Sequence, residues 1–344
     1  MSSEYIIPVQ NEDYASYRIR ALSFFEHLKE PVEVYETGDF GLTPHNLLKK
    51  QNYSQRKKAV KDLKFHLKDR KIFLSRKIFD GITRGQLVAN IFKNAEYSVY
   101  DVDDAIMFPA RKYKLPFGGP YVWKAGVLNA SQVIVGNEFL AEEALKLRPD
   151  VNIIPTCIHP NDYQEKINYE PEKQFTVTWI GSQTTEKYLI DIQDQLKKVH
   201  QEGIKLQIIS SPAEQSMLGS FEQYVERIPW NIDTFSQHLQ QADVGIMPLR
   251  NTLWERGKCG YKLLQYAATG LPMLGSPVGV NKKILSDLGG IAVSQENDWL
   301  DSILDLKNST STDREKMGRY SREHVQSLYS YETWSNEWSS IVNG

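Results

Sequence analysis

The sequence predicts a two-domain α/β protein in which each domain is built on a parallel β-sheet. Its 344 residues exceed the length at which one hydrophobic core keeps growing. The chain opens with a strand–helix–strand order, which joins parallel strands. After the polar stretch NDYQEKINYEPEK at 161–173, a new strand pattern begins at 175–180. We therefore expect domains at 1–165 and 166–320, followed by a terminal helix at 321–344.

Composition places the chain among ordinary globular proteins, with 41% hydrophobic and 24% charged residues. No apolar run approaches the roughly 18 residues of a membrane span, and the first residues lack the pattern of a signal peptide. Cys157 and Cys259 are the only cysteines, so neither a disulfide framework nor a thiolate metal site is indicated. We expect a cytoplasmic location.

Hydrophobic periodicity and turn residues predict the elements of the first domain in order. Strands are expected at 4–9, 32–35, 71–74, 97–101 and 132–135. Helices are expected at 14–28, where Pro31 follows the end, at 81–93, at 121–129, and at 137–147, where Asn137 is the N-cap. Residues 107–123 contain three prolines and two adjacent glycines, which predicts an irregular loop.

A strongly basic segment lies between two of these elements. Residues 49–77 contain twelve Lys or Arg and only two Asp, a net charge of +10 in a chain whose total is −2. Val60, Leu63 and Leu67 form an apolar stripe at helical spacing, so one interpretation is a solvated helix docked by that stripe. The other is attraction to an anionic membrane surface or a lipid diphosphate. Nucleic acid is not expected as a partner, because aromatic residues that could stack on bases are few here.

Three acids follow the strand at 97–101. In open parallel sheets ligands gather at the carboxyl ends of strands, which gives Asp101, Asp103 and Asp104 functional interest. They could bind or deprotonate a substrate hydroxyl, hold Mg²⁺ or Mn²⁺, or, for one of them, cap a helix. We favour the first interpretation and expect no metal.

The second domain offers two turns suited to an anion. Gly181 and Ser182 end the strand at 175–180, before a helix from about residue 186. A second helix begins near Gly260, after the strand at 244–247, and we expect Lys258 and Lys262 on one face of it beside the first N–H groups. The alternative is an ordinary solvated basic helix start. Further elements are a strand at 206–210, another ending at 227–230, a helix at 233–241, an apolar run after Pro272, and helices beyond 298.

The run GKCGYKLLQYAATGLPMLGSPVGVN resembles the donor-site helix of retaining glycosyltransferases of the family-four (group 1) type. NASQVIVGNEFLAEEA and TVTWIGSQTT resemble other units of the same group. The resemblance implies the GT-B fold, two Rossmann-like domains with a cleft between them, and C-terminal helices that cross back to the first domain. It also implies transfer of a sugar from a nucleotide-diphosphate donor of UDP or GDP type, with no cofactor.

The resemblance assigns roles residue by residue. Asp103, Asp104 and Lys258 are expected to be catalytic, and Arg18, Asp101 and Asn137 to lie on the acceptor side; surface pairing of Arg18 and simple capping by Asn137 are the alternatives. Trp230 is expected either to stack on the base or to fill the core. The expected donor-binding residues are Gly181, Ser182, Trp230, Arg250, Lys258, Cys259, Gly260, Tyr261, Lys262 and Gln265.

The chain departs from the group at two glutamates. The register places Gly257 at the first and Gln265 at the second, with Glu255 as a loop substitute for the first. The expected function is glycosyl transfer to a glycan or lipid-linked acceptor in bacterial surface polysaccharide or glycolipid synthesis, at the inner face of the membrane. A non-catalytic sugar-nucleotide-binding subunit and a GT-B nucleotide-sugar epimerase are the alternatives.

Overall fold

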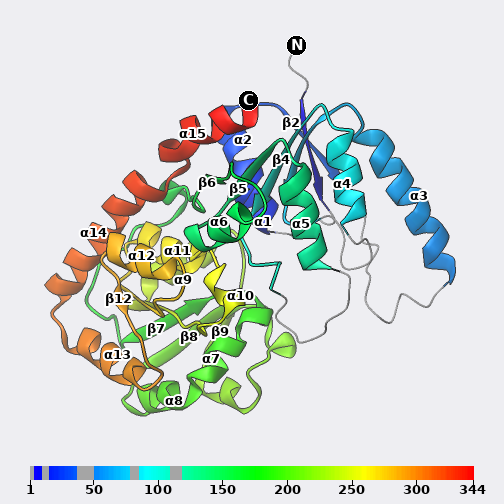
Figure 1. Cartoon of the computed structure of the whole chain (residues 1–344). Helices are drawn as coiled ribbons and strands as arrows, with labels where there is room; N and C mark the ends of the chain where they lie inside the picture. The colour runs from blue at the N-terminus through cyan, green and yellow to red at the C-terminus, as the bar shows by residue number, and fades with distance from the viewer. Residues whose placement is uncertain (1–3, 10–14, 37–49, 78–84, 109–117) are drawn as a thin grey trace. The chain divides into compact units, whose positions relative to one another are not determined.

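A computed structural model describes residues 4–9, 15–36, 50–77, 85–108 and 118–344, with only the backbone for 50–56. The chain forms two compact units (Figure 1). The first comprises Met1–Cys157, Thr252–Cys259 and Trp334–Gly344, and the second comprises Ile158–Asn251 and Gly260–Thr333. Residues 252–259 and 334–344, both far along the chain, therefore complete the N-terminal unit.

The first unit is built on a six-stranded parallel sheet of order β2-β1-β3-β4-β5-β6. Its central strands are mostly buried, because the apolar residues of segments such as YIIPV and KIFLS pack on both faces of the sheet. The strands are β1 (Tyr5–Val9), β2 (Val32–Glu36), β3 (Lys71–Ser75), β4 (Tyr97–Val102), β5 (Gln132–Val135) and β6 (Asn152–Ile153).

Helices cover this sheet where the sequence pattern predicts them. The first predicted helix is interrupted by a π-helical turn, Arg18–Leu22, between two α-helical pieces. The α-helices of this unit are α1 (Ala15–Tyr17), α2 (Ser23–Leu28), α3 (Lys50–His66), α4 (Gln86–Lys93), α5 (Gly119–Asn129), α6 (Glu138–Leu145), α10 (Leu253–Arg256) and the end of α15 (Tyr331–Asn343).

The C-terminal helix supplies a core residue to the first unit. Trp338 is 1% exposed and stacks on Phe24 at 4.9 Å between ring centroids. It also contacts Phe25 edge-on and Phe73. In Figure 1 the red α15 accordingly lies beside the blue α2. Trp338 and Ile341 are buried, whereas Trp334 is only partly buried.

The second unit repeats the architecture with the sheet order β12-β11-β10-β7-β8-β9, all parallel. This order places β10 next to β7, so the loops that follow these two strands lie at the same edge of the sheet. The strands are β7 (Thr176–Ile180), β8 (Lys205–Ser210), β9 (Glu226–Pro229), β10 (Val244–Met247), β11 (Met273–Gly275) and β12 (Ile291–Ala292).

The helices of this unit begin where the sequence places turn residues. Gly260 and Gly270 flank α11 and both adopt the left-handed conformation that favours glycine. The helices are α7 (Lys187–Asp191), α8 (Gln193–Gln201), α9 (Phe235–Gln241), α11 (Tyr261–Thr269), α12 (Asn281–Asp287), α13 (Asp298–Asn308) and α14 (Ser311–Tyr329), with 3-10 turns at Pro160–Asp162, Gln183–Thr185, Ala213–Gln215 and Gly219–Tyr224.

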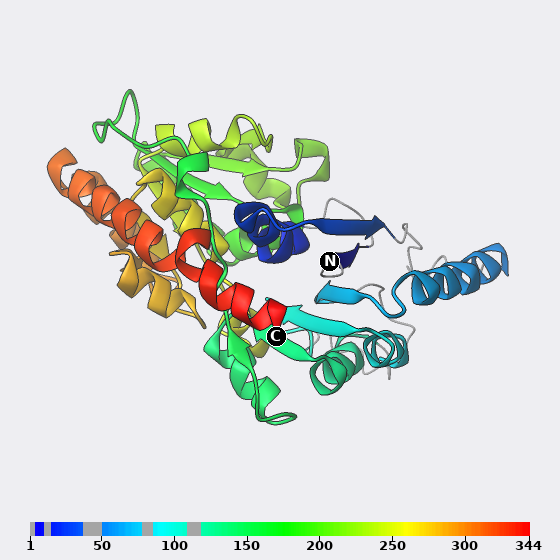
Figure 2. The same cartoon turned by 90° about the horizontal axis from the view of Figure 1, so that it is seen from above.

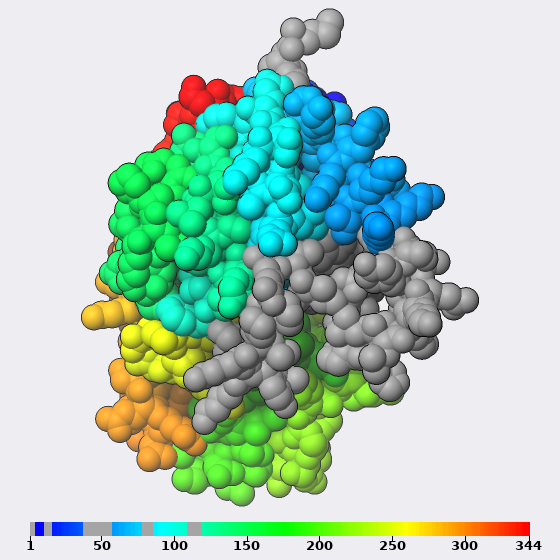
Figure 3. Space-filling view, turned by 45° about the vertical axis from the view of Figure 1, so that its right-hand side comes forward, coloured from blue at the N-terminus to red at the C-terminus, as the bar shows by residue number. Residues whose placement is uncertain are grey.

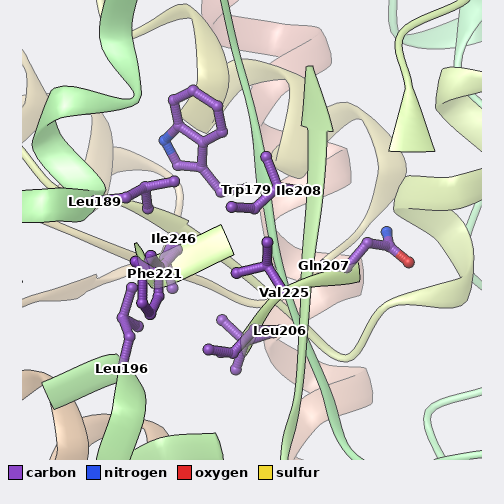
Figure 4. A pocket seen from close by; sticks show the side chains of 10 residues that line it. Trp179, Leu189, Leu196, Leu206, Gln207, Ile208, Phe221, Val225 and Ile246 are labelled. Carbon is purple, nitrogen blue, oxygen red and sulfur yellow. The ribbon is translucent and has the colours of Figure 1, made fainter. Parts of the chain in front are cut away.

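An apolar pocket lies inside this second unit (Figure 4). Of its lining residues only Gln207 is polar, and its side chain points away from the others, with its amide donating to the Thr178 hydroxyl at 3.1 Å. A pocket without converging polar groups is a feature of core packing rather than a binding site. The lining residues are Val177, Trp179, Leu189, Leu196, Leu206, Gln207, Ile208, Phe221, Val225 and Ile246.

Some predictions fall outside the described residues. These are most of the loop at 107–123, the start of the helix at 81–93, and the first residue of the basic segment. Within the part of the chain that the structure describes, no helix has the length and apolar character needed to cross a membrane.

Candidate functional site

The carboxyl end of β4 holds three buried acids, as predicted. Asp101, Asp103 and Asp104 are 0%, 4% and 5% exposed. Burying a carboxylate is costly unless a cation or hydrogen-bond donors accompany it. Each of these acids has such a partner within the first unit, and we call the three acids with Arg20, Arg76 and Lys258 the acid cluster.

Arg20 neutralises Asp101. Its Nη2 donates to Asp101 Oδ1 at 2.6 Å, its Nε donates to the same carboxylate at 3.2 Å, and its Nη1 donates to the Ile154 carbonyl at 2.7 Å. Burial raises the pKa of Asp101 to about 6 although Arg20 opposes the rise. The pKa of Arg20 is raised, because the attraction of Asp101 outweighs the effect of its burial. This pair is ionised and fully enclosed at neutral pH.

Asp103 and Asp104 share two further cations. The Arg76 guanidinium pairs with both carboxylates, and Lys258 Nζ donates to Asp104 Oδ1 at 2.8 Å. The Ser16 hydroxyl donates to Asp103 Oδ2 at 3.0 Å. Although burial raises it, the pKa of Asp103 lies below its usual value because Arg76 and Arg20 favour the charged form.

The acid cluster thus contains three carboxylates and three cations. A carboxylate whose pKa is lowered is a weaker base, so this arrangement suits Asp103 to accept a hydrogen bond rather than to remove a proton. Capping does not account for the three acids, because all three side chains lie in ion pairs. The described ranges contain no group of three or more His, Cys, Asp or Glu side chains that could hold a metal ion.

Asn137 connects two elements of the first unit. Its Oδ1 accepts from the Leu140 N–H at 3.0 Å, which is the predicted N-cap of α6. Its Nδ2 donates to the carbonyls of Gly257 and Lys258, both at 3.2 Å. The side chain is 2% exposed, so capping alone does not describe it. Asn137 fixes the backbone that carries Lys258 toward Asp104.

Replacing Asn137 with aspartate separates these two contacts. Aspartate keeps the oxygen that caps α6 but has no N–H to donate, and its charge faces two carbonyl oxygens. We expect Asn137→Asp to destabilise the protein by about 1–3 kcal/mol in urea unfolding. The control is Thr310→Asn at the exposed N-cap of α14, where an amide keeps both the oxygen that caps Asp313 N–H and a donor for Asp313 Oδ2, so stability should change by no more than about 0.5 kcal/mol. Equal stability of the two variants would contradict the second contact.

Lys258 does not lie on the helix that the sequence predicted for it. That helix, α11, begins at Tyr261, because Gly260 adopts a positive φ of 68° and separates the preceding turn from it. Lys258 lies in this turn with its ammonium 5.2 Å from the centre of the Trp254 ring, as well as on Asp104. The prediction that Lys258 and Lys262 share one helical face is therefore wrong.

Gly257 occupies the position of the missing first glutamate, and its surroundings leave no room for one. A Cβ added to Gly257 would lie 2.5 Å from the Ala105 Cβ and 2.6 Å from its backbone nitrogen. Glu255 is buried two residues earlier and accepts a hydrogen bond from the Thr252 hydroxyl. The loss of the glutamate thus accompanies close packing of this turn against the residue that follows Asp104.

The second unit brings Gly181 and Lys262 together, and we call this place the Gly181 corner. A Cβ added to Gly181 would lie 2.5 Å from the Trp179 ring and 2.7 Å from Lys262 Cε. Lys262 Nζ lies 5.2 Å from the centre of the Trp179 ring. The loop after β7 and the first turn of α11 therefore meet, and the positive end of the helix dipole faces the same region. The corner combines a cation, a helix start and a glycine backbone, which suits a diphosphate.

Gln265, at the position of the second glutamate, contacts a group of aromatic residues in this unit. Its Nε2 donates to the Tyr163 hydroxyl at 3.3 Å, and the Tyr261 hydroxyl lies 3.4 Å from the same oxygen. Tyr163 packs edge-on against Phe235, which stacks with Trp230 at 5.9 Å. Trp230 is 45% exposed, so the interpretation that it fills the core is wrong.

The remaining candidates are placed as follows. Arg250 binds Asp191 at the end of α7 through two contacts of 2.5 Å. Ser182 lies next to Gly181 with its hydroxyl 3.1 Å from that of Thr184. Burial raises the pKa of the Cys259 thiol, which makes a thiolate unfavourable. Arg18 is exposed, unlike its neighbour Arg20.

Sequence reasoning missed Arg20 and Arg76. The signal for Arg20 was present, since Tyr17, Arg20 and Phe24 recur at the helical spacing of a buried face. In the sequence, Arg76 is one of the twelve Lys and Arg residues of the basic segment and has no local signal of its own. Its position at the end of β3, paired in register with β4, brings it to the acids.

Comparison of the sequence with family models gives one match. Residues 174–309, most of the second unit, match the model described as "Glycosyl transferases group 1". This part of the chain is therefore similar to that family, in agreement with the resemblance seen in the sequence. A comparison with curated proteins finds no match.

Solved structures show the fold of the whole chain. Anabaena Alr3699/HepE, in complex with UDP and glucose, has a TM-score of 0.74 at 11% identity, with 99% of this chain and 100% of that chain covered. A glycosyltransferase from Rickettsia africae has a TM-score of 0.67 at 11% identity, with 100% and 98% covered. S. aureus TarM, in complex with UDP, α-GlcNAc-glycerol and fondaparinux, has a TM-score of 0.61 at 17% identity.

The match with TarM covers 83% of this chain but only 58% of TarM, so this chain spans less than two thirds of that protein. At these identities the likeness shows the fold and not the activity. The two parallel six-stranded sheets and these likenesses confirm the predicted fold class, the GT-B arrangement of two Rossmann-like domains.

Proposed function

We propose that this protein is a glycosyltransferase that moves a sugar, a hexose, from a nucleotide-diphosphate donor to an acceptor hydroxyl. The observation that carries the proposal is the group 1 match over residues 174–309, which contains the whole sheet of the second unit and the Gly181 corner. A GT-B fold alone would not carry it, because a fold hosts many functions.

The donor diphosphate is assigned to the Gly181 corner. The negative charge that develops on the leaving diphosphate would be stabilised by Lys262, by the backbone at Gly181 and Ser182, and by the start of α11 after Gly260. Such stabilisation needs no metal in this proposal. Gln265, Tyr261 and the half-exposed Trp230 would hold the nucleoside, with Arg250 and Cys259 as further candidates. UDP is the first nucleotide to test, since HepE and TarM were both solved with it.

The acceptor side is assigned to the acid cluster. Asp103 and Asp104 would bind the acceptor hydroxyl, while Asp101, Asn137 and Arg18 support that side. Lys258, proposed for both chemistry and donor binding, is already paired with Asp104, so a role on the diphosphate requires that pair to open. In the reaction the bond from the anomeric carbon to the diphosphate oxygen breaks, a bond to the acceptor oxygen forms, and the proton of the acceptor hydroxyl passes to the departing diphosphate, with retention by family resemblance.

The biological context proposed is bacterial surface polysaccharide or glycolipid synthesis, with a glycan or lipid-linked acceptor. The net charge of +10 over residues 49–77 supports a peripheral location at the inner face of the membrane. A nucleic-acid partner is not proposed.

The proposal is tested by mixing the full chain with UDP- and GDP-sugars and measuring release of nucleotide, first with water and then with simple glycosides as acceptors. Catalysed release that is lost in Lys262→Ala would support a transferase. Tight binding of nucleotide without turnover would replace the proposal with a non-catalytic binding subunit. Conversion of the donor to another nucleotide sugar, with no release and no acceptor, would instead identify an epimerase.

The non-catalytic subunit is the second candidate because of two observations. Gly257 packs so closely on Ala105 that a glutamate side chain does not fit there, and the Gln265 amide donates a hydrogen bond to the Tyr163 hydroxyl. The protein thus lacks both glutamates that the group uses for the donor. Gln265 still offers an amide oxygen to a ribose hydroxyl, so nucleotide binding is expected in either case.

A further inference from the structure

We propose that the exposed face of α3 docks the protein on the surface of a bilayer that contains anionic lipid, with Phe65 entering the interface. The face consists of Lys57, Lys58, Lys61, Lys64 and Phe65. It belongs to the first unit and shares no residue with the acid cluster or the Gly181 corner, so the inference rests on the peripheral location proposed above and not on the transfer reaction.

The opposite side of α3 accounts for its attachment to the unit. Leu63 is fully buried and Leu67, just after the helix, is 1% exposed, and both belong to the main core of the first unit, with Val60 packed against it. His66 Nε2 lies 2.6 Å from Glu33 Oε1, and Arg70 donates to Glu33 Oε2 at 3.1 Å, which fixes the end of the helix to β2. These contacts need neither Phe65 nor the lysines.

Phe65 is 84% exposed, the largest exposed fraction among the exposed large hydrophobic residues of the described chain. At 3.6 residues per turn it points away from the buried stripe, and Lys58 and Lys61, seven and four residues earlier, share its side of the helix. Figure 2 shows α3 extending outward from the first sheet, and Figure 3 shows its blue atoms at the surface. Among the described residues, no contact explains an apolar ring in this position.

The charges around Phe65 are available to a partner. Among the described residues, Lys57, Lys58, Lys61 and Lys64 form no ion pair, and all four are exposed. Lys68 is close to Asp69 at 3.7 Å, and Asp62 is the one acid on the helix itself. Lysine stems can lie along an apolar surface while their ammonium groups stay with headgroup phosphates.

A bilayer explains the combination of groups better than a nucleic acid does. An aromatic ring surrounded by lysines gains by leaving water at a lipid interface, where aromatic residues are enriched. A polyanion in solution would bind the lysines but would gain little from a single phenylalanine. The discriminating observation is therefore the effect of Phe65 on binding.

The experiment is co-sedimentation of the full chain with vesicles of phosphatidylcholine alone and of phosphatidylcholine with phosphatidylglycerol, in the absence of donor and acceptor. We expect binding only to the anionic vesicles, falling as salt rises from about 0.1 M to about 0.5 M. Lys58→Gln with Lys61→Gln should lower the partition coefficient by roughly 30-fold, on the order of fivefold for each lysine. Phe65→Ser should lower it by roughly tenfold.

Leu145→Ser is the matched control, because Leu145 is an apolar residue of the same unit that is 51% exposed, at the end of α6. This variant should bind vesicles as the unaltered chain does. Thermal unfolding of each variant shows whether it is folded. Unchanged binding of Phe65→Ser, or equal binding to neutral vesicles, would overturn the proposal. So would binding to a DNA fragment that displaces the vesicles and is insensitive to Phe65. A chain that binds vesicles but transfers no sugar would refute the proposed function alone.

Discussion

Replacing Lys262 with alanine will weaken the binding of UDP by roughly ten- to a hundredfold and leave the binding of uridine almost unchanged. A charge-assisted hydrogen bond to a phosphate contributes about 1.5–3 kcal/mol, and this lysine lies against Gly181 where the diphosphate is assigned. Isothermal titration of the two ligands measures the difference directly. Lys262 is a cleaner test than Lys258, because Lys258→Ala would also leave Asp104 with one cation fewer.

The matched control for this experiment is Lys283→Ala. Lys283 belongs to the same unit, on α12, and its exposed ammonium pairs with Asp287 at 2.7 Å. The Lys283→Ala variant should bind UDP with unchanged affinity. Equal losses for UDP and uridine in Lys262→Ala would mean that the lysine supports the fold of the site rather than the diphosphate.

The second large effect is expected on stability. Arg20→Ala leaves the Asp101 carboxylate and the Ile154 carbonyl buried without their donor. Removal of one partner from a buried pair costs about 3–5 kcal/mol, and we expect a loss of that size in urea unfolding followed by circular dichroism. Replacing both partners at once, as Arg20→Met with Asp101→Leu, should restore a large part of the lost free energy of unfolding.

Arg18→Ala provides the control for this loss. Arg18 lies in the same π-helical turn but is exposed, so its removal should change the free energy of unfolding by no more than about 0.5 kcal/mol. If Arg18→Ala and Arg20→Ala were equally stable, the buried pair would not stabilise the first unit as described.

Most of the fold follows from the sequence because its elements have strong local signals. The strand at Val244–Met247 has the predicted bounds, and α11 begins one residue after Gly260. The π-turn at Arg18–Leu22 has no such signal. Its presence is an effect of tertiary packing, which places Arg20 on Asp101 inside the unit.

The candidate site was predictable where it depends on strand ends and not where it depends on long-range pairing. Asp101, Asp103 and Asp104 end a strand, and Gly181 ends another, as predicted. The partners of the acids come from positions as far apart as Ser16 and Lys258, and no local pattern reveals such pairs. The roles assigned to these residues by resemblance stay predictions.

The place of Trp338 in the core of the first unit has a consequence for synthesis of the protein. Phe24, Phe25 and Phe73 emerge from the ribosome long before the indole that covers them. The N-terminal unit therefore cannot complete its core during translation of its own strands, and must wait until Trp338 has been made. Nascent chains stalled before residue 334 should be captured by chaperones that recognise exposed aromatic surface.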